Sequence, residues 1–365
     1  MSLKHPLLFK SLCYVNGQWI HSRSGASVAV QNPANLAEIG HVPMLEREQI
    51  VAAVDAAERA FASWRLQSLD ERAALLQRWA ALILQHQDDL AAILCEEQGK
   101  PLAEAQGEVA YAASFLEWFA EEGKRLYGDV IPAHAGDKRI LVQKEPVGVT
   151  AAITPWNFPN AMLMRKVAPA LAAGCTMVAK PAEDTPLSTL YVAHLAKEIG
   201  YPDGVINVIP GIGEQTGAAL SENPNLKRMS FTGSPEVGRM VASNCGGNLI
   251  PVKLELGGKG AAVIFNDVDI NDAAEKLVGA ITFHTGQVCC DATRWLIQRD
   301  IYDDFINVAV ERLKAVKIGH QMDDGTQMGP VVSEVQRNRV LGYLGKGAAG
   351  GAEMLLEGGA AEVGG

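Results

Sequence analysis

The strongest constraint on the fold is an alternation of short apolar runs and helical segments between residues 147 and 255. Four runs rich in β-branched residues each precede a segment of helical periodicity; they are Val147–Thr154, Thr176–Ala179, Val205–Ile209 and Met229–Thr232. Strands that alternate with helices predict a parallel sheet covered by helices on both faces. Ligands of such sheets bind beyond the carboxyl ends of the strands. The sequence therefore predicts an α/β fold with functional residues on the turns that follow these strands.

The flanking segments predict a helical block and further α/β structure. Over residues 46–123, apolar side chains recur at helical spacing. Later, the alternation resumes with strands at Ala261–Phe265 and Trp295–Gln298. The stretch Gly345–Gly365 is rich in glycine and alanine and shows no closing element. For a chain of 365 residues we expect two packed units.

Charge and cysteine content exclude several classes of protein. The formal net charge of −10 argues against a nucleic-acid binder. No stretch approaches the roughly 18 consecutive apolar residues of a membrane span, and the first residues lack a signal-peptide apolar run. The chain has no Cys-x-x-Cys, and its eight histidines show no metal-ligand spacing beside the six cysteines. These features favour a reduced, cytoplasmic setting without a structural metal.

The segment Gly286-Gln287-Val288-Cys289-Cys290 places thiols after a turn that contains glycine. A nucleophilic thiol must be accessible and needs a lowered pKa or a nearby base. Because a predicted strand follows, Cys289 could present its sulfur to a cleft. The alternative, which the segment by itself favours, is that both cysteines are buried small apolar residues.

Two further segments follow predicted strands and carry side chains suited to catalysis. Glu255 stands beside Gly257 and Gly258, where a mobile carboxylate could act as a general base on water. Asn157 stands between prolines that stiffen its loop, and a fixed side-chain amide can donate to a developing oxyanion. The alternatives are a solvated loop glutamate and an ordinary strand-terminating turn.

Two turns could hold a nucleotide. Residues 233–238 lead from a strand into a helix, and backbone amides at such a helix start can face a pyrophosphate. Their spacing is not the Gly-x-Gly-x-x-Gly fingerprint and no Walker lysine is present, so this pattern is weak by itself. Lys180 and Glu183 could place a cation and a carboxylate near a ribose; the alternative is a salt-bridged surface turn.

In this order and with these surroundings, the segments resemble those of the aldehyde dehydrogenase superfamily. The resemblance extends from about Tyr14 to the end of the chain. The strings Pro-Trp-Asn-Phe-Pro, Phe-Thr-Gly-Ser and Glu-Leu-Gly-Gly-Lys match the family, as does the interval from Glu255 to Cys289. The resemblance implies a Rossmann-like parallel sheet for the cofactor and a second α/β catalytic domain.

The resemblance also implies roles for individual residues. Cys289, rather than its neighbour Cys290, would be the nucleophile; Asn157 and the Cys289 N–H would form the oxyanion hole, and Glu255 would be the base. The family's cofactor is NAD or NADP, and its contacts would lie on the turns after the strands: Trp156, Lys180, Glu183, Gly213, Gly233, Ser234, Gly238 and Leu256. Glu183 would bond to a free ribose 2′-hydroxyl, so NAD is expected over NADP.

The implied reaction is the oxidation of an aldehyde to a carboxylic acid. The Cys289 thiolate attacks the aldehyde carbon, hydride passes to the nicotinamide, and the resulting thioester is hydrolysed by water that Glu255 activates. Relatives that pass the acyl group to coenzyme A lack this glutamate, so hydrolysis is expected here.

Two stretches, Ser114–Arg125 and Met164–Gly174, resemble succinate-semialdehyde dehydrogenases and imply a semialdehyde substrate. In that subfamily the arginine at the position of Arg165 pairs with the distal carboxylate of the substrate, which suits its forked donors. The alternative is a surface ion pair. Phe283 and His284 stand where the subfamily usually has arginine and asparagine, so selectivity for an acidic aldehyde is expected to fall. His284 is expected to be a packing substitution first; the alternative is that it alters the environment of the thiol.

The resemblance divides the chain into three parts. Residues 1–123 and 147–257 correspond to the NAD(P)-binding domain, residues 124–146 to part of an oligomerisation arm, and residues 258–365 to the catalytic domain. A homo-oligomer is therefore implied for the full-length chain. The family's chain normally continues further, with a Glu-x-Phe-Gly-Pro segment that holds the nicotinamide ribose. We therefore expect a C-terminally truncated member of the family, either a fragment of an enzyme or a non-catalytic nucleotide-binding relative.

Overall fold

The computed structural model of the chain describes residues 3–361 and 363, and its centre is a seven-stranded sheet. The strands from β11 to β9 are parallel, whereas β1 runs antiparallel to both β9 and β2. In sheet order they are β11 (Val252–Leu256), β10 (Arg228–Gly233), β7 (Val149–Ile153), β8 (Thr176–Lys180), β9 (Ile206–Val208), β1 (Cys13–Val15) and β2 (Gln18–Ile20). Four of the parallel strands, β7, β8, β9 and β10, coincide with the four apolar runs of the sequence.

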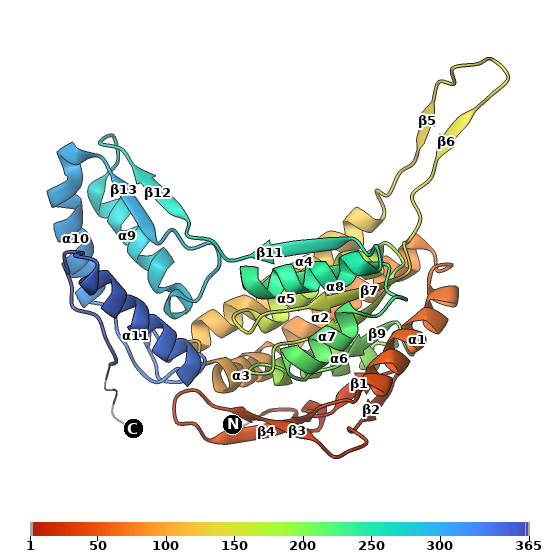
Figure 1. Cartoon of the computed structure of the whole chain (residues 1–365), viewed down its shortest axis with the longest axis horizontal. Coiled ribbons are helices and arrows are strands. Elements are labelled where there is room, and N and C mark those ends of the chain that lie inside the picture. The colour runs from red at the N-terminus through yellow and green to blue at the C-terminus, as the bar shows by residue number, and fades with distance from the viewer. Residues whose placement is uncertain (1–2, 362, 364–365) are drawn as a thin grey trace.

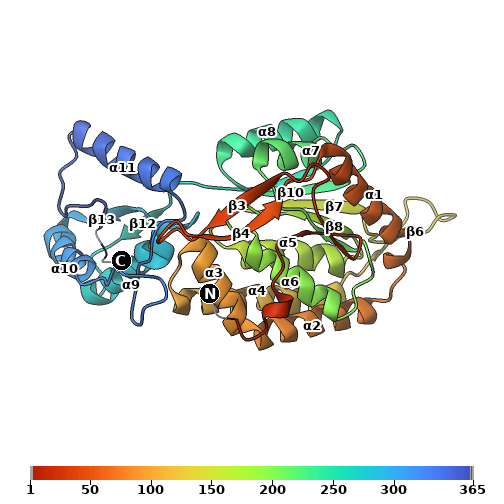
Figure 2. The same cartoon turned by 90° about the horizontal axis from the view of Figure 1, so that it is seen from below.

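Helices cover both faces of this sheet (Figure 2). One face carries α2 (Leu69–Gln85), α3 (Gln87–Gln98), α4 (Leu102–Gly123), α5 (Pro159–Ala172) and α6 (Leu187–Glu198); the other carries α1 (Arg47–Trp64), α7 (Ala218–Ser221) and α8 (Pro235–Gly247). Successive side chains of a strand point to opposite faces, so Ala152 joins the first core while Ala151 and Ile153 join the second. A strand buried on both sides is therefore apolar throughout.

The chain changes direction within the sheet at β7. From β7 the strands β8 and β9 extend to one side, and β10 and β11 are added on the other. Because α5 follows β7 on one face and α8 follows β10 on the other, the loops that leave these two neighbouring strands diverge. A crevice opens at such a point, at the carboxyl ends of the strands.

A smaller unit follows β11 after the turn 257–260 and stands apart from the main body in Figure 1. It contains the parallel pair β12 (Ala261–Ile264) and β13 (Arg294–Ile297), with α9 (Ile270–Thr282) and α10 (Tyr302–Lys314) packed on one face. Its core is built from Ile264, Ala274, Val278, Phe305 and Ala309. Asp269 begins α9 by accepting from the Asp272 N–H, as an N-cap residue does.

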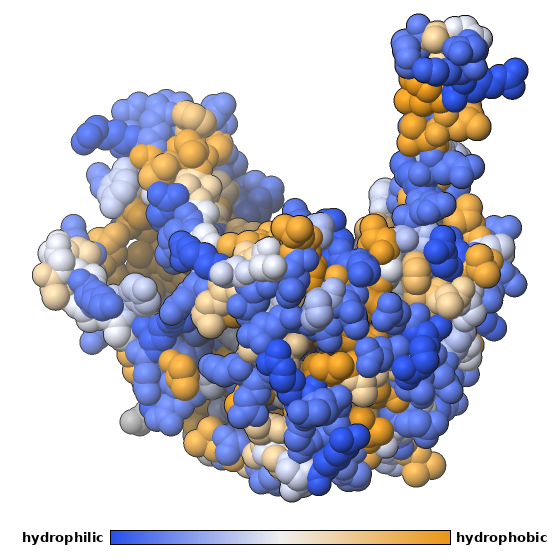
Figure 3. Space-filling model, turned by 45° about the vertical axis from the view of Figure 1, so that its right-hand side comes forward, coloured by the Kyte–Doolittle hydropathy of each residue, from blue (hydrophilic) through white to orange (hydrophobic). Residues whose placement is uncertain are grey.

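Two hairpins lie outside the sheet. One joins β3 (Ser27–Gln31) to β4 (Glu38–Pro43), and the other joins β5 (Asp129–Ile131) to β6 (Ile140–Val142). The second projects far from the body (Figure 1) and carries a band of apolar atoms (Figure 3). Val130 is 81% exposed and Leu141 is 66% exposed, so this hairpin presents apolar surface that no described residue covers.

The structure confirms the predicted α/β fold class and differs in two places. The antiparallel edge of β1 and β2 was not expected, because strands of three residues show no usable periodicity. Helix α11 (Glu334–Ala349) occupies a stretch for which no helix was expected, and it buries none of its side chains. Among the described residues, none of the helices combines the length and the apolarity that crossing a membrane requires.

Candidate active site

A cavity of about 1140 Å³ lies where the crevice of the sheet meets the smaller unit. Its walls come from the carboxyl ends of β7, β10 and β11, from α4, α5 and α11, and from the segment that follows α9. It brings together most of the residues singled out from the sequence: Trp156, Asn157, Arg165, Gly233, Ser234, Glu255, Leu256 and Cys289. Residues far apart in the chain thus share one site.

Cys289 lies just after the short helix η3 (Phe283–Gly286), which ends in a left-handed turn. Cys289 and Cys290 are both exposed, whereas the other four cysteines are buried. The alternative that both are buried apolar residues is therefore wrong. The turn presents the Cys289 thiol to the cavity.

The environment of Cys289 does not by itself produce a thiolate. Partial desolvation raises the pKa of the Cys289 thiol, and the neighbouring Cys290 raises it further, while the Arg165 cation lowers it by a smaller amount. The thiol form therefore prevails near neutral pH. Attack on an electrophile requires a base or a ligand-induced change in the site.

Glu255 lies near the end of β11, where it pairs in register with Thr232. A hydrogen bond from Lys253, whose Nζ lies 3.1 Å from Glu255 Oε1, is the main cause of a lowered pKa of this carboxyl. Glu255 is therefore ionised at neutral pH, as a base must be. Its side chain is half-buried and lines both the main cavity, which Cys289 also lines, and a neighbouring one of about 690 Å³.

Asn157 is held at both its side chain and its backbone. Its Nδ2 donates to the Gln287 carbonyl over 2.8 Å, which fixes the orientation of the amide. An amide nitrogen carries two hydrogens, so one remains for an oxyanion. The Asn157 carbonyl accepts from Lys100 Nζ at 2.8 Å, and Lys100 forms a buried ion pair with Glu108. Glu108 also accepts from the Asn160 N–H at 2.9 Å and so fixes the start of α5.

Arg165 contributes a cation to the wall of the cavity. It is exposed on α5 and lines both cavities. Phe283 also lines the main cavity and stacks on Phe158 with 6.0 Å between ring centroids. The cavity therefore offers the forked donors of Arg165 together with aromatic surface.

The residues expected to hold a dinucleotide lie along the same edge of the sheet. Lys180 ends β8 beside the last residue of β7, and its buried Nζ lies 2.6 Å from Glu183 Oε2. Gly213 begins η2 (Gly213–Gly217) beyond β9. Lys180, Glu183, Gly213 and Gly238 do not line the main cavity itself.

The strand-to-helix turn after β10 fits a phosphate group. A Cβ on Gly233 would lie 2.6 Å from the Phe231 ring, and one on Gly238 would lie 2.7 Å from Leu256 Cδ2. The turn therefore has no room for larger side chains. Ser234 caps α8 by accepting from the Val237 N–H. Pro235 has no N–H and the Gly238 N–H donates to the Ser234 carbonyl, so within the first turn of this helix the Glu236 N–H is the amide left for an anion. The residues present thus fit a dinucleotide.

Several wall residues were not found from the sequence. They are Glu104 and Tyr111 of α4, and Gln336, Arg339 and Tyr343 of α11. The three residues of α11 stand three and four positions apart, which places them on one face of a helix. The spacing could indicate that these three residues share a wall of the cavity only if the sequence had first predicted a helix at this position.

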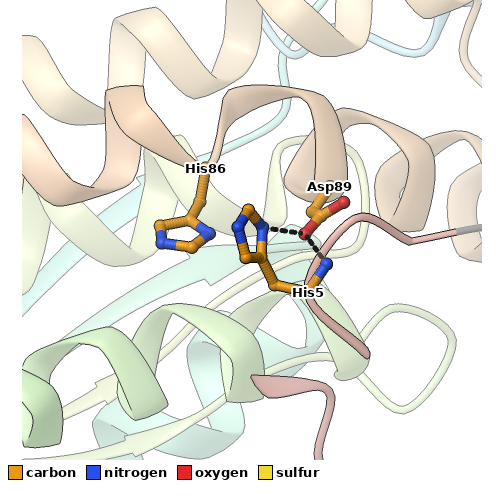
Figure 4. Close-up of side chains that lie close together, drawn as sticks. All are labelled: His5, His86 and Asp89. Atoms are coloured by element: carbon orange, nitrogen blue, oxygen red, sulfur yellow. Dashed lines mark hydrogen bonds and ion pairs between the residues drawn. The ribbon is translucent and has the colours of Figure 1, made fainter. Parts of the chain in front are cut away.

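A second cluster of potential ligands lies at the N-terminal segment, where His5 approaches His86 and Asp89 (Figure 4). Asp89 Oδ2 accepts from the His5 N–H at 2.9 Å, is 3.0 Å from His5 Nδ1, and accepts from the Tyr191 hydroxyl at 3.0 Å. That hydroxyl also lies 3.0 Å from His86 Nδ1. A metal ion bound between His86 and Asp89 would have to displace the Tyr191 hydroxyl from these two side chains. These hydrogen bonds attach the N-terminal segment to α3.

Comparison with known proteins gives the family. Residues 19–365 match the model of the aldehyde dehydrogenase family. The chain is 45% identical over 365 residues to succinate-semialdehyde dehydrogenase [NADP(+)] of Escherichia coli, covering 100% of this chain and 76% of the relative. It is 44% identical over 358 residues to glutarate-semialdehyde dehydrogenase of Pseudomonas putida, covering 98% of this chain and 75% of the relative.

Solved structures agree. The crystal structure of succinate-semialdehyde dehydrogenase from Burkholderia pseudomallei superposes with a TM-score of 0.97 at 42% identity, covering 99% of this chain and 75% of that one. The chain thus spans about three-quarters of the length of these relatives. On this evidence of sequence and fold, the chain belongs to the aldehyde dehydrogenase family and is an NAD(P)-dependent aldehyde oxidoreductase.

Proposed function

We propose that this enzyme oxidises a semialdehyde, an aldehyde with a distal carboxylate, to the dicarboxylic acid through a thioester on Cys289. One observation carries the proposal: a single cavity holds Cys289, Asn157 and Glu255 together with the cation of Arg165. The relatives named for succinate and glutarate semialdehydes support the same substrate class. The alternative of a non-catalytic nucleotide-binding relative is not favoured, because the nucleophile, base and oxyanion donor converge.

Each residue of the site has a proposed task. Glu255, ionised at neutral pH, removes the proton from Cys289 directly or through water, and the sulfur then attacks the aldehyde carbon. The free hydrogen of Asn157 Nδ2 and the Cys289 N–H stabilise the oxyanion. NAD(P), held by the turns after β8 and β10, would supply the hydride acceptor. Glu255 then activates water to hydrolyse the thioester, and this carboxylate argues against transfer of the acyl group to coenzyme A.

Replacement of Arg165 with alanine tests the substrate class. Loss of a charge-assisted contact is expected to lower kcat/KM for succinate semialdehyde about 10-fold to 100-fold. Butanal has the same number of carbons but no carboxylate, so its kcat/KM is expected to change by less than about threefold. Arg165→Lys keeps the charge and loses the fork, and an intermediate value is expected. Equal losses for both aldehydes would exclude Arg165 as the carboxylate contact.

We also propose that the enzyme prefers NAD to NADP, although the Escherichia coli relative is named for NADP(+). The Glu183 carboxylate would repel a 2′-phosphate on the adenosine ribose. Glu183→Ser is expected to raise the ratio of kcat/KM for NADP to that for NAD by about tenfold or more. Glu198→Ser makes the same charge change at the far end of α6 and serves as the control. An unchanged ratio in Glu183→Ser would show that another group reads the ribose.

We propose that two parts of the chain have different roles in the enzyme, one in cofactor binding and the other in catalysis. The body, residues 1–123 and 147–257, binds the cofactor, and residues from 258 onwards carry the nucleophile. The exposed apolar surface of the β5–β6 hairpin, within residues 124–146, supports a homo-oligomer in which this hairpin is covered. All six cysteines are free, which supports a reducing, cytoplasmic location.

A further inference from the structure

The turn that precedes the nucleophile has an unusual backbone. His284, Thr285 and Gly286 are three consecutive residues with φ of 53°, 56° and 70°. Side chains other than glycine rarely adopt this left-handed conformation, so surrounding contacts must hold it. Because this turn directly precedes Cys289, the contacts that hold His284 also affect the position of Cys289.

His284 is buried and contacts the corner between α3 and α4. Its N–H donates to the Glu104 carboxylate, 3.0 Å from Oε2, and its ring lies 5.0 Å from the Phe158 ring. Its Nε2 lies 2.9 Å from Gln98 Nε2. The Gln98 oxygen is already engaged, since Oε1 accepts from the Lys100 N–H at 2.9 Å.

These contacts define the protonation of the His284 ring. An amide nitrogen can only donate, so Gln98 Nε2 donates and His284 Nε2 accepts. The proton of the ring is then on Nδ1, a buried atom for which the described residues provide no hydrogen-bond acceptor, and the ring is neutral. Burial lowers the pKa of His284 well below its usual value, and the nearby Lys100 cation lowers it further, which agrees with a neutral ring.

A continuous hydrogen-bonded path leads from His284 to the oxyanion donor. The His284 carbonyl accepts from the Gln287 N–H at 3.1 Å and from Gln287 Nε2 at 3.2 Å. The Gln287 carbonyl in turn accepts from Asn157 Nδ2. The short segment that begins at His284 therefore both carries Cys289 and anchors the side chain of Asn157 through the Gln287 carbonyl.

We infer that His284 is a positioning residue, which accepts from Gln98 and holds the left-handed turn so that Cys289 and Asn157 face the same point of the cavity. The inference rests on the proposed function, because it assumes that these two residues act together. It replaces the expectation of a packing substitution with a specific polar role. Lys100, at the same corner between α3 and α4, also donates to the Asn157 carbonyl. This corner therefore contacts both the segment that carries Cys289 and the loop that carries Asn157.

Two substitutions of His284 distinguish the effect of its hydrogen bond with Gln98 from the effect of the volume of its side chain. His284→Phe fills the space without an acceptor, and His284→Gln can place an oxygen where Nε2 lies. We expect His284→Phe to lower kcat about 10-fold to 100-fold while KM for aldehyde and cofactor changes less than about threefold. We expect His284→Gln to restore kcat to within about threefold. The alkylation rate of Cys289 by iodoacetamide, followed on its peptide by mass spectrometry, should change in parallel with kcat.

His86→Phe is the matched control, because it removes another buried histidine that bonds to Tyr191 away from the site. It is expected to lower the Tm and keep kcat. A wild-type kcat and alkylation rate in His284→Phe, or a His284→Gln variant as impaired as His284→Phe, would overturn the inference. If His284→Phe does not fold, Gln98→Met removes the same hydrogen bond by changing its donor. The same loss of kcat is expected, and a wild-type kcat and alkylation rate in Gln98→Met would overturn the inference. A wild-type enzyme that turns over no semialdehyde would refute the proposed function, while the alkylation rates would still decide the role of His284.

Discussion

Replacement of Cys289 with alanine is expected to abolish aldehyde-dependent NADH formation, with a loss in kcat on the order of 10⁴-fold or more. No other exposed thiol except Cys290 lies among the described residues, and the turn presents Cys289 next to the segment that anchors Asn157. Binding of NAD should persist, because its proposed contacts lie at the ends of β8 and β10. Initial rates by NADH absorbance and cofactor titration by calorimetry measure the two properties.

The adjacent thiol provides the control. Cys290→Ala changes the same chemistry one residue away, and we expect it to retain kcat within about tenfold. The variant should also remain sensitive to iodoacetamide. Abolished activity in Cys290→Ala with activity preserved in Cys289→Ala would reverse the assignment of the nucleophile.

Replacement of Glu255 with glutamine is expected to uncouple the two halves of the reaction. The amide cannot activate water, so hydrolysis of the thioester should slow by about 10² to 10⁴-fold. Where water can still carry the Cys289 proton, the first turnover should release about one NADH per active site before the slow steady state. Stopped-flow absorbance measures this burst.

The double variant Cys289→Ala with Glu255→Gln should show no burst, which ties the burst to the thiol. A Glu255→Gln enzyme with a wild-type steady-state rate would exclude Glu255 as the hydrolytic base. Loss of the burst as well as the steady state would show that the Cys289 proton leaves only through Glu255 and that water cannot replace this carboxylate in the first step.

Much of this site could be predicted because its residues follow strands of a parallel sheet. Asn157, Gly233 and Glu255 lie at or just beyond strand ends that the alternation of apolar runs marks, and parallel strands bring their carboxyl ends to one edge. Local pattern was therefore enough to place them. The assignment of the nucleophile needed the resemblance to the family, since the cysteine pair alone favoured a buried role that the structure contradicts.

Other features depend on contacts between distant parts of the chain. The anchor of Asn157 on the Gln287 carbonyl joins residues 130 positions apart, and the support from Gln98 to His284 joins residues 186 positions apart. No periodicity encodes such pairs. Helix α11 was missed for another reason: its glycines lower helix propensity and it buries no side chain, so it has no apolar stripe to detect.

The most direct test of the central claim is the mass of the Glu255→Gln enzyme after rapid mixing with NAD and succinate semialdehyde. We predict a succinyl adduct on the peptide that contains Cys289, at about one per chain and in step with one NADH released. Digestion of the quenched protein locates the adduct. NADH formation without an adduct, or an adduct on a residue other than Cys289, would contradict the account.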